Sequence, residues 1–259
     1  MIAATATPAD VEQLVEAHRE TWLRQAEATI MALDPQDYRH GRTFHVLDFT
    51  EVGAPPRGYL GFTAGDQLHE LAEHLLPHSR NVPAAAVAVN VEAIAREAVT
   101  TADADTSDRL DAIRAAVAAV AAHELAHVLD ARAEGRRLPE GASLDAVVRS
   151  LVDGRASNHE HQTKTHSPGW LRAFLHLTLR HGSRDRAWMA RVVADVAAVM
   201  PHEAETYFDA LRPDFMQHRR EARLVDVLRS PAPRAFLDLF DSHDTDHPAT
   251  GALAHASPS

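Results

Sequence analysis

The spacing of apolar residues divides the chain into an N-terminal part of mixed character and a helical C-terminal part. In residues 8–31 apolar side chains recur every three or four positions, which predicts an amphipathic helix. Short apolar runs bounded by turn residues predict strands over 43–49, 58–64 and 84–91. A helix is expected over 65–76, where Pro77 would stop it. The small and acidic stretch TTADADTSD then predicts a linker.

From about residue 107 onward every periodic segment is helical. The longest reads SDRLDAIRAAVAAVAAHELAHVLDARAEG, and we expect it to begin at Ser107 or Asp108 and to end at Gly135. Further helices are predicted over 143–153, 168–181, 184–199, 201–211, 214–229 and 233–240. Residues 241–259 contain few large apolar side chains, so we expect a disordered tail there.

These elements predict an α+β protein that is predominantly helical. A small N-terminal sheet packs on the long helix, and a helical C-terminal half follows it. We divide the chain into a core over residues 1–182, a helical extension over 183–240 that packs on the core, and the tail. No apolar run approaches the roughly 18 residues that a membrane span needs. The N-terminus lacks the features of a signal peptide, so we expect a cytoplasmic protein.

Composition narrows the chemistry that the chain can perform. It has no cysteine, which excludes disulfides, a cysteine nucleophile and a cysteine-ligated zinc ribbon. A metal ion would therefore have to be held by histidine and carboxylate side chains. The net charge of −11 argues against a nucleic-acid partner, because phosphate contacts require clustered lysine and arginine. The oligomeric state is left open.

The long helix contains the pentapeptide HELAH, which has the HExxH spacing of zinc hydrolases. His123 and His127 lie four residues apart, on one face of the helix, and can bind the same ion. Glu124 would stand beside the open coordination position, where it can act as a general base. The chain has 18 histidines, yet only about 0.08 such matches are expected by chance.

The surrounding helix favours a functional reading of this motif. Its apolar stripe continues by steps of three and four onto the two histidines and the glutamate; the stripe residues are Leu110, Ile113, Val117 and Val120. Ionisable groups on a buried face are costly unless they are paired or bind a metal. The alternative is a pair of half-buried histidines packed against a polar partner. HELAEH at 69–74 has histidines five apart and is expected to be helix surface.

A catalytic zinc site needs a third protein ligand, and His166 is the best placed candidate. It precedes Ser167, a good helix N-cap, and Pro168, which suits the first helical position. The helix that follows carries an apolar stripe that can pack beside the HELAH helix. The geometry leaves other candidates open, namely Asp153, His159, Glu160 and His161. Asp130 follows His127 too closely to share its metal, but it could accept a hydrogen bond from a ligand histidine.

The two motifs together resemble the SprT-like and related minimal gluzincin-type zinc metallopeptidases. In that family a histidine just before a proline and an aromatic residue closes the metal site, and here His166 precedes Pro168 and Trp170. The apolar strand at 84–91 is similar to the family's substrate-edge strand. The resemblance covers roughly residues 58–180. The chain departs from the family in its long interval between motifs, in Ser167 where glycine is usual, and in lacking a cysteine-rich zinc ribbon.

We therefore predict a divergent zinc metallopeptidase with a zincin-like core and a peptide or protein substrate. One Zn²⁺ ion would be bound by His123, His127 and His166, and Glu124 would be the general base toward a zinc-activated water. A further group that stabilises the oxyanion is expected, but the sequence singles out none. One alternative is a non-catalytic helical interaction protein with a structural or vestigial metal site. Another is a metallohydrolase that acts on a different kind of bond.

Overall fold

The structure, a computed structural model, describes residues 8–38, 43–51, 60–62, 84–101, 106–134, 166–182, 185–218 and 222–244. These residues are predominantly helical with one small sheet, which confirms the predicted α+β class. The strands are β1 (Thr43–Asp48), β2 (Gly61–Phe62) and β3 (Ala84–Val89). The helices are α1 (Pro8–Leu33), α2 (Pro35–Tyr38), α4 (Val91–Thr101), α5 (Thr106–Ala133), α8 (Pro168–His181), α9 (Arg186–Val199), α10 (Ala204–Gln217), α11 (Leu224–Arg229) and α12 (Arg234–Asp244).

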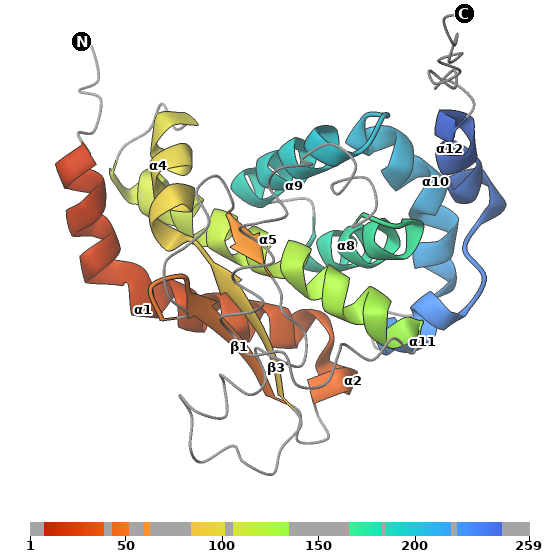
Figure 1. Cartoon of the computed structure of the whole chain (residues 1–259), viewed down its shortest axis with the longest axis horizontal. Helices are drawn as coiled ribbons and strands as arrows, with labels where there is room; N and C mark the ends of the chain where they lie inside the picture. Colours follow the sequence, from red (N-terminus) through yellow and green to blue (C-terminus); the bar gives the residue numbers. More distant parts are fainter. Residues whose placement is uncertain are drawn as a thin grey trace, which may run out of the picture.

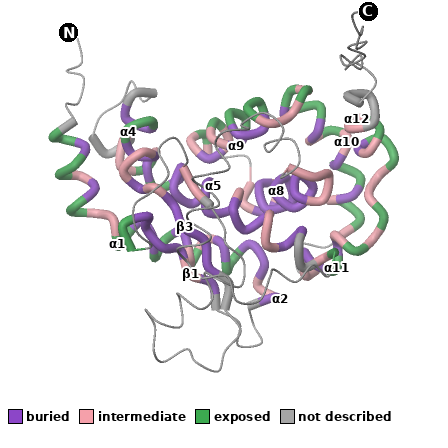
Figure 2. Tube along the Cα trace, viewed as in Figure 1, coloured by how far each residue is buried: buried purple, intermediate pink, exposed green. Residues whose placement is uncertain are grey.

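Helix α5 runs through the middle of the molecule, with α1, α4 and the sheet on one side and α8 and α9 on the other (Figure 1). Its alanine-rich sequence lets these elements approach closely, and every residue from Ala115 to Ala122 is buried (Figure 2). Of the predicted stripe, Ile113, Val117 and Val120 are buried in the core, and Leu110 is partly buried against it. A helix that is apolar on nearly all sides is a core helix.

The same apolarity gives α5 the composition of a membrane span. Within the segment Arg109–Asp130, a window of 18 residues has a mean hydropathy of 1.4, but 72% of that window is buried inside the molecule. Its apolar surface is therefore used in packing against other elements, as in the core helix of a soluble protein. The described residues contain no second segment of this kind.

The sheet has the order β1-β3-β2. β1 runs parallel to β3, with Thr43 opposite Ala84, and β2 runs antiparallel to it, with Gly61 opposite Val89. The expectation that 84–91 is an edge strand is therefore wrong, because β3 is paired on both sides. Among the described strands, β2 has the edge position nearer to α5. Of the strand predicted over 58–64, residues 60–62 are described, and Gly61–Phe62 form β2.

Helix α4 was not predicted, and it shortens the strand before it. Asn90 ends β3 and caps α4, because its side-chain oxygen accepts a hydrogen bond from the Ala93 N–H at 3.0 Å. Val91, which we assigned to the strand, is the first residue of the helix. The helix buries Ile94 and Ala95 about one turn further on. No element was predicted between the strand at 84–91 and the linker, although the apolar residues there recur at spacings of three and four, which is a helical signal.

The helix predicted over 168–181 is confirmed at both ends as α8. The neighbouring helix α9 also agrees with its prediction over 184–199, apart from its start. Asp185 caps it by accepting a hydrogen bond from the Trp188 N–H at 3.0 Å. Both helices begin at a side-chain cap, which is why local sequence was enough to find them.

The predicted break at Pro213 is wrong. Helix α10 continues through Pro213 to Gln217, and the helix expected over 214–229 is reduced to α11. A proline inside a helix costs about 3 kcal/mol in isolation. Here the next residue, Asp214, is buried and accepts two hydrogen bonds from Arg172, at 2.7 and 2.8 Å. Because this contact holds the last turn on α8, tertiary packing outweighs the local preference.

The end of the chain also differs from the prediction. Helix α12 continues to Asp244, so residues 241–244, which we assigned to a disordered tail, are helical. Residues 245–259 lie outside the described residues, as do the predicted helices over 65–76 and 143–153.

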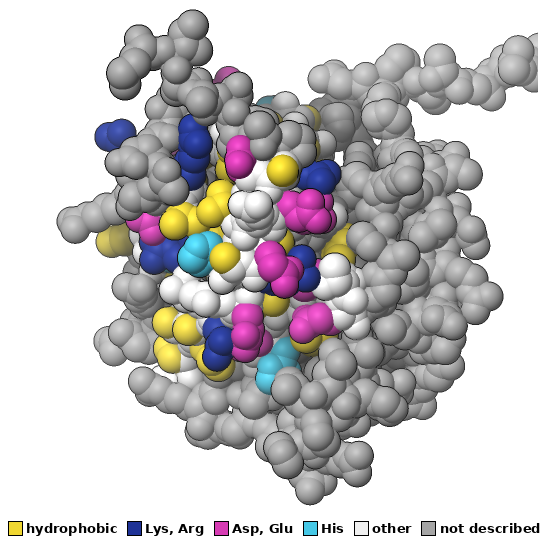
Figure 3. All heavy atoms as spheres, turned by 90° about the vertical axis from the view of Figure 1, so that its left-hand side faces the viewer, with side chains coloured by type: hydrophobic (Ala, Val, Ile, Leu, Met, Phe, Trp, Pro, Cys, Tyr) yellow, Lys and Arg dark blue, Asp and Glu magenta, His cyan; other side chains and the backbone are white. Residues whose placement is uncertain are grey.

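The face that carries α1 and α4 shows acidic and basic side chains side by side (Figure 3). On α1, Glu20 pairs with Arg24 at 2.7 Å, and on α4, Glu92 pairs with Arg96. Exposed pairs of this kind contribute at most about 1 kcal/mol. Within the described part of this face, the mixture of signs differs from the basic stripe of a nucleic-acid binder.

Candidate metal centre

Two histidines of α5 and one that precedes α8 meet between these two helices. His123 and His127 project from one face of α5, and His166 stands two residues before α8. Their ring centroids are 5.0 to 5.3 Å apart, and one ring nitrogen from each lies within 4.8 Å of the other two. Nε2 of His123 and Nε2 of His166 are separated by 3.3 Å. The three predicted ligands are thus brought together.

This geometry fits a single metal ion. Two nitrogens bound at about 2.0–2.1 Å to a tetrahedral ion lie about 3.3–3.4 Å apart, which is the separation of the two Nε2 atoms. Imidazole is a ligand for zinc, copper, iron and nickel. A neutral imidazole has a single N–H donor, so three rings that face one another gain little from mutual hydrogen bonds. The cluster of His123, His127 and His166 could therefore hold a metal ion.

The start of α8 is fixed by hydrogen bonds that hold His166 in place. Ser167 caps the helix, because its Oγ accepts a hydrogen bond from the Trp170 N–H at 3.0 Å. The same hydroxyl donates to Asp130 Oδ2 on α5 at 2.6 Å. Since Asp130 lies three residues beyond His127, this contact ties the third histidine to the helix that carries the other two.

Gly169 allows α8 to approach α5 this closely. A Cβ atom at this position would clash with Asp130 Oδ1 and would lie 3.0 Å from Asp130 Cγ. Any larger residue would therefore push the start of α8 away from the carboxylate. A carboxylate at a helix N-terminus is also favoured by the helix dipole.

Trp170 packs against all three imidazoles. Its ring centroid lies 4.8 Å from that of His123, 5.3 Å from that of His127, onto which it stacks, and 4.3 Å from that of His166. The indole N–H donates to the backbone oxygen of His123 at 3.2 Å. Aromatic contacts of this kind contribute about 0.5–1.5 kcal/mol each and restrict ring rotation. The rings are therefore ordered by packing, independently of any ligand.

Glu124 lies beside the histidines in a nearly closed environment. The residue is 7% exposed, and burial raises the pKa of its carboxyl to about 7 even though the charge of His123 acts in the opposite direction. Gly61 of β2 is close by, because a Cβ there would lie 2.8 Å from Glu124 Oε1 and from Val120 Cγ1. The glycine thus lets the edge strand of the sheet come against the carboxylate.

Helix α9 supplies a carboxylate that we did not predict. Asp195 Oδ2 lies 3.3 Å from Nδ1 of His123, the ring nitrogen on the far side from Nε2. Burial opposes ionisation of Asp195, but hydrogen bonds and charges from His123 and Arg191 outweigh it and hold the pKa of the carboxyl below its ordinary value. Burial alone would lower the pKa of His123. The interaction with Asp195 raises it more than any other group does, and the pKa of His123 lies above its ordinary value.

One signal in the sequence could have pointed to Asp195. It falls on the buried side of α9, seven residues after Trp188 and three after Val192, and next to the buried Val196. A carboxylate at such a position needs a partner. Sequence alone could not name that partner, because His123 lies on another helix far away along the chain.

The other predicted candidates for the third ligand, Asp153, His159, Glu160 and His161, lie outside the described residues. So does the HELAEH stretch. The roles predicted for the four motif residues, as ligands and as general base, stay predictions at this point.

Comparison with known proteins adds no relative to this picture. No family model, no curated protein and no solved structure matches the chain.

Proposed function

We propose that the chain is a zinc-dependent metallopeptidase, as the HELAH motif and its resemblance to SprT-like enzymes predicted. The observation that carries the proposal is the convergence of His123, His127 and His166 with Glu124 beside them. A catalytic zinc site has three protein ligands and a nearby carboxylate that is not one of them. Three imidazoles also make a ligand set that is known for catalytic zinc.

Each of these side chains would have a separate task. The three imidazoles would hold the ion, which when bound polarises the scissile carbonyl and makes water more acidic. Glu124 would accept a proton from the attacking water and return it to the leaving amine. A carboxyl with a pKa near neutrality is suited to both transfers, and a nearby cation would favour its ionised form at the start of the cycle.

Strand β2 would guide the substrate to this centre. Gly61 brings the backbone of β2 against Glu124, so a peptide aligned with this strand would pass close to the general base. Extended peptides bind sheet edges through main-chain hydrogen bonds. We therefore assign to β2 the substrate-edge role that we had expected of residues 84–91. A cytoplasmic location belongs to the same proposal.

Metal content and hydrolysis test this function together. Protein purified without a histidine tag should contain one equivalent of zinc by mass spectrometry. It should cleave members of an unstructured peptide library, and a chelator should abolish cleavage until zinc is added back. Protein that binds no zinc under these conditions would contradict the proposal.

The low exposure of Glu124 favours one alternative, a non-catalytic protein with a structural metal site. That alternative predicts one equivalent of zinc, a lower melting temperature on its removal and no cleavage of any peptide. Metal content combined with hydrolysis therefore separates the two.

A further inference from the structure

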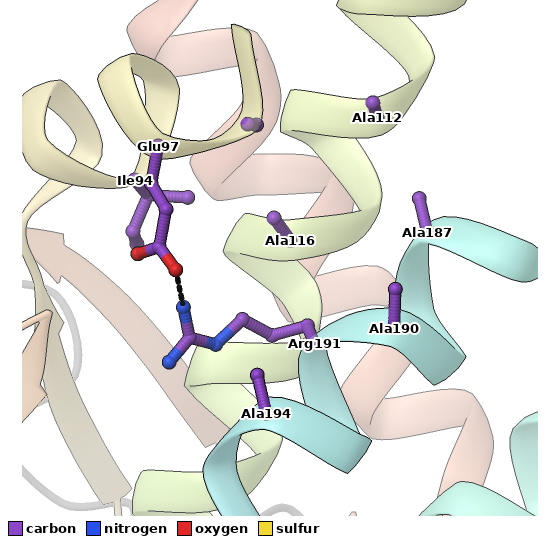
Figure 4. Close-up of a pocket in the computed structure, with 9 residues that line it drawn as sticks. Ile94, Glu97, Ala112, Ala116, Ala187, Ala190, Arg191 and Ala194 are labelled. Carbon is purple, nitrogen blue, oxygen red and sulfur yellow. Dashed lines mark hydrogen bonds and ion pairs between the residues drawn. The ribbon is translucent and has the colours of Figure 1, made fainter. Parts of the chain in front are cut away.

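A chain of ion pairs from three helices ends on the histidine cluster. Asp195 of α9 contacts Nδ1 of His123 at 3.3 Å. Arg191, one turn earlier on α9, donates to the same aspartate through Nε at 2.7 Å and through Nη2. Its Nη1 donates to Glu97 Oε1 of α4 at 2.9 Å, at the outer end of the chain (Figure 4).

Side-chain exposure falls along this chain from Glu97 to Asp195, and the His123 side chain is 15% exposed. The exposure is 48% for Glu97, 16% for Arg191 and 7% for Asp195. Exposed ion pairs contribute little because water screens them, whereas charged hydrogen bonds become stronger as water is excluded. The contacts of Asp195 with Arg191 and His123 are therefore better shielded from water than the contact between Arg191 and Glu97, which is the weak end.

The weak end borders a cleft of about 160 Å³ between α4, α5 and α9. Its walls include small side chains from two helices, Ala112 and Ala116 on α5 and Ala187, Ala190 and Ala194 on α9 (Figure 4). Because this space lies beside the Arg191 guanidinium, a change at Glu97 disturbs little tightly packed structure. A substitution of Glu97 is therefore a suitable control, because it removes a partner of Arg191 and leaves the contact between Asp195 and His123 in place.

We propose that Asp195 is a positioning residue for the metal centre. A neutral imidazole carries its proton on one nitrogen only, so a carboxylate that accepts the Nδ1–H of His123 leaves the lone pair on Nε2. Nε2 is the atom that meets His166. A carboxylate partner also fixes the ring orientation and raises its basicity as a ligand. Arg191 in turn orients the carboxylate with two hydrogen bonds.

This role makes α9 part of the metal centre, although it lies beyond residue 182, where we placed the end of the core. The inference rests on the proposed function only in assuming that the cluster binds zinc, and it does not require hydrolysis.

The test compares Asp195→Asn with Glu97→Gln in the full, tag-free chain. Zinc affinity would be measured by competition with a chromophoric chelator at constant pH, since protons compete with the metal for histidine. Asp195→Asn removes the carboxylate partner of His123, which should weaken zinc binding about 10–100-fold. Glu97→Gln, which removes the exposed partner of the same arginine, should stay within about threefold of the wild type.

Nuclear magnetic resonance of the zinc-loaded protein supplies a readout that altered packing alone would not give. The His123 Nδ1–H should appear as a slowly exchanging downfield proton, should move upfield in Asp195→Asn and should be unchanged in Glu97→Gln. If Asp195→Asn does not fold, the wild-type spectrum decides, because a His123 protonated on Nε2 would overturn the inference.

The possible outcomes separate this inference from the proposed function. Wild-type zinc affinity in Asp195→Asn, or equal losses in both variants, would overturn the positioning role and leave the metallopeptidase proposal standing. A wild type that binds zinc but cleaves no peptide would overturn only the proposed function. A wild type that binds no zinc overturns both.

Discussion

Helix α8 borders two clusters of histidine-containing polar groups that differ in how their charges are matched. The histidine cluster, made of His123, His127 and His166, lies at its start. The second, which we call the Asp214 cluster, lies along its middle and contains Arg172, His176, Asp214 and Ser230. In the Asp214 cluster one carboxylate accepts hydrogen bonds from Arg172 at 2.7 and 2.8 Å and contacts His176 Nε2 at 3.0 Å.

In the Asp214 cluster the donors are matched by acceptors. Arg172 also donates through Nη1 to the Ser230 backbone oxygen at 2.7 Å. Burial lowers the pKa of His176, and the nearby Asp214 only partly opposes this. In the histidine cluster, by contrast, Nε2 of His123 faces Nε2 of His166, and the carboxylate of Asp195 lies on the outer side of His123. A matched set of donors and acceptors stabilises a fold, whereas converging lone pairs suit a cation.

The largest expected effect is on folding and comes from breaking the Asp214 cluster. Asp214→Asn would leave the buried Arg172 charge without its carboxylate, which should lower the free energy of unfolding by about 3–5 kcal/mol. Urea denaturation of the zinc-free protein measures this loss. The folded variant should bind zinc with wild-type affinity, and a parallel loss of zinc would show that the two clusters are not separate in function.

The next largest effect is on metal binding. His166→Ala should weaken zinc binding by about 100-fold or more, because it removes a ligand rather than a partner of a ligand. The matched control is His176→Ala, which removes a histidine from the helix that follows His166 but should leave zinc affinity within about threefold of the wild type. Chelator competition at constant pH measures both. If His166→Ala keeps its zinc while Asp153→Ala, His159→Ala or His161→Ala loses it, the ligand set is a different one.

A smaller effect concerns the two ends of α8. Gly169→Ala should force the start of the helix away from Asp130, at a cost of about 1–3 kcal/mol in stability, and should weaken zinc binding several-fold by displacing His166. Gly182→Ala at the other end is also strained, because Gly182 has a φ of 100°, but a Cβ there meets nothing within 4 Å. It should lower the melting temperature without changing zinc affinity. Equal zinc affinity in the two variants would remove the argument that the helix start positions His166.

The smallest effect is on the acid dependence of stability. Hydrogen bonds from His176 and Arg172 outweigh burial and hold the pKa of Asp214 well below its ordinary value of 3.8. A depressed carboxyl contributes stability above its unfolded pKa and loses it as the pH falls. Between pH 5 and pH 3 the wild type should therefore lose about 1 kcal/mol more than Asp214→Asn does. Denaturant titrations at the two pH values measure the difference. An equal loss of unfolding free energy in the wild type and in Asp214→Asn would contradict the depressed pKa.

The parts of this picture that could be predicted from sequence are those that local chemistry determines. Ser167 and Pro168 identify the start of α8, and the stripe on α5 identifies the buried face of HELAH, because both depend on residues within a few turns. The continuation of α10 through Pro213 could not be predicted, since Arg172 on another helix stabilises it. Asp195 escaped prediction for the same reason.

The central claim is that Glu124 acts as the base at a zinc ion held by the three histidines, and Glu124→Gln tests it most directly. The substitution keeps the size of the side chain and removes its ability to accept a proton. The account predicts one equivalent of zinc and an unchanged fold in the variant, with peptide hydrolysis reduced by about 10²–10⁴-fold. Metal content and the rate of peptide cleavage would be measured on the same preparation. A variant that retains its zinc and cleaves peptides at the wild-type rate would contradict the claim.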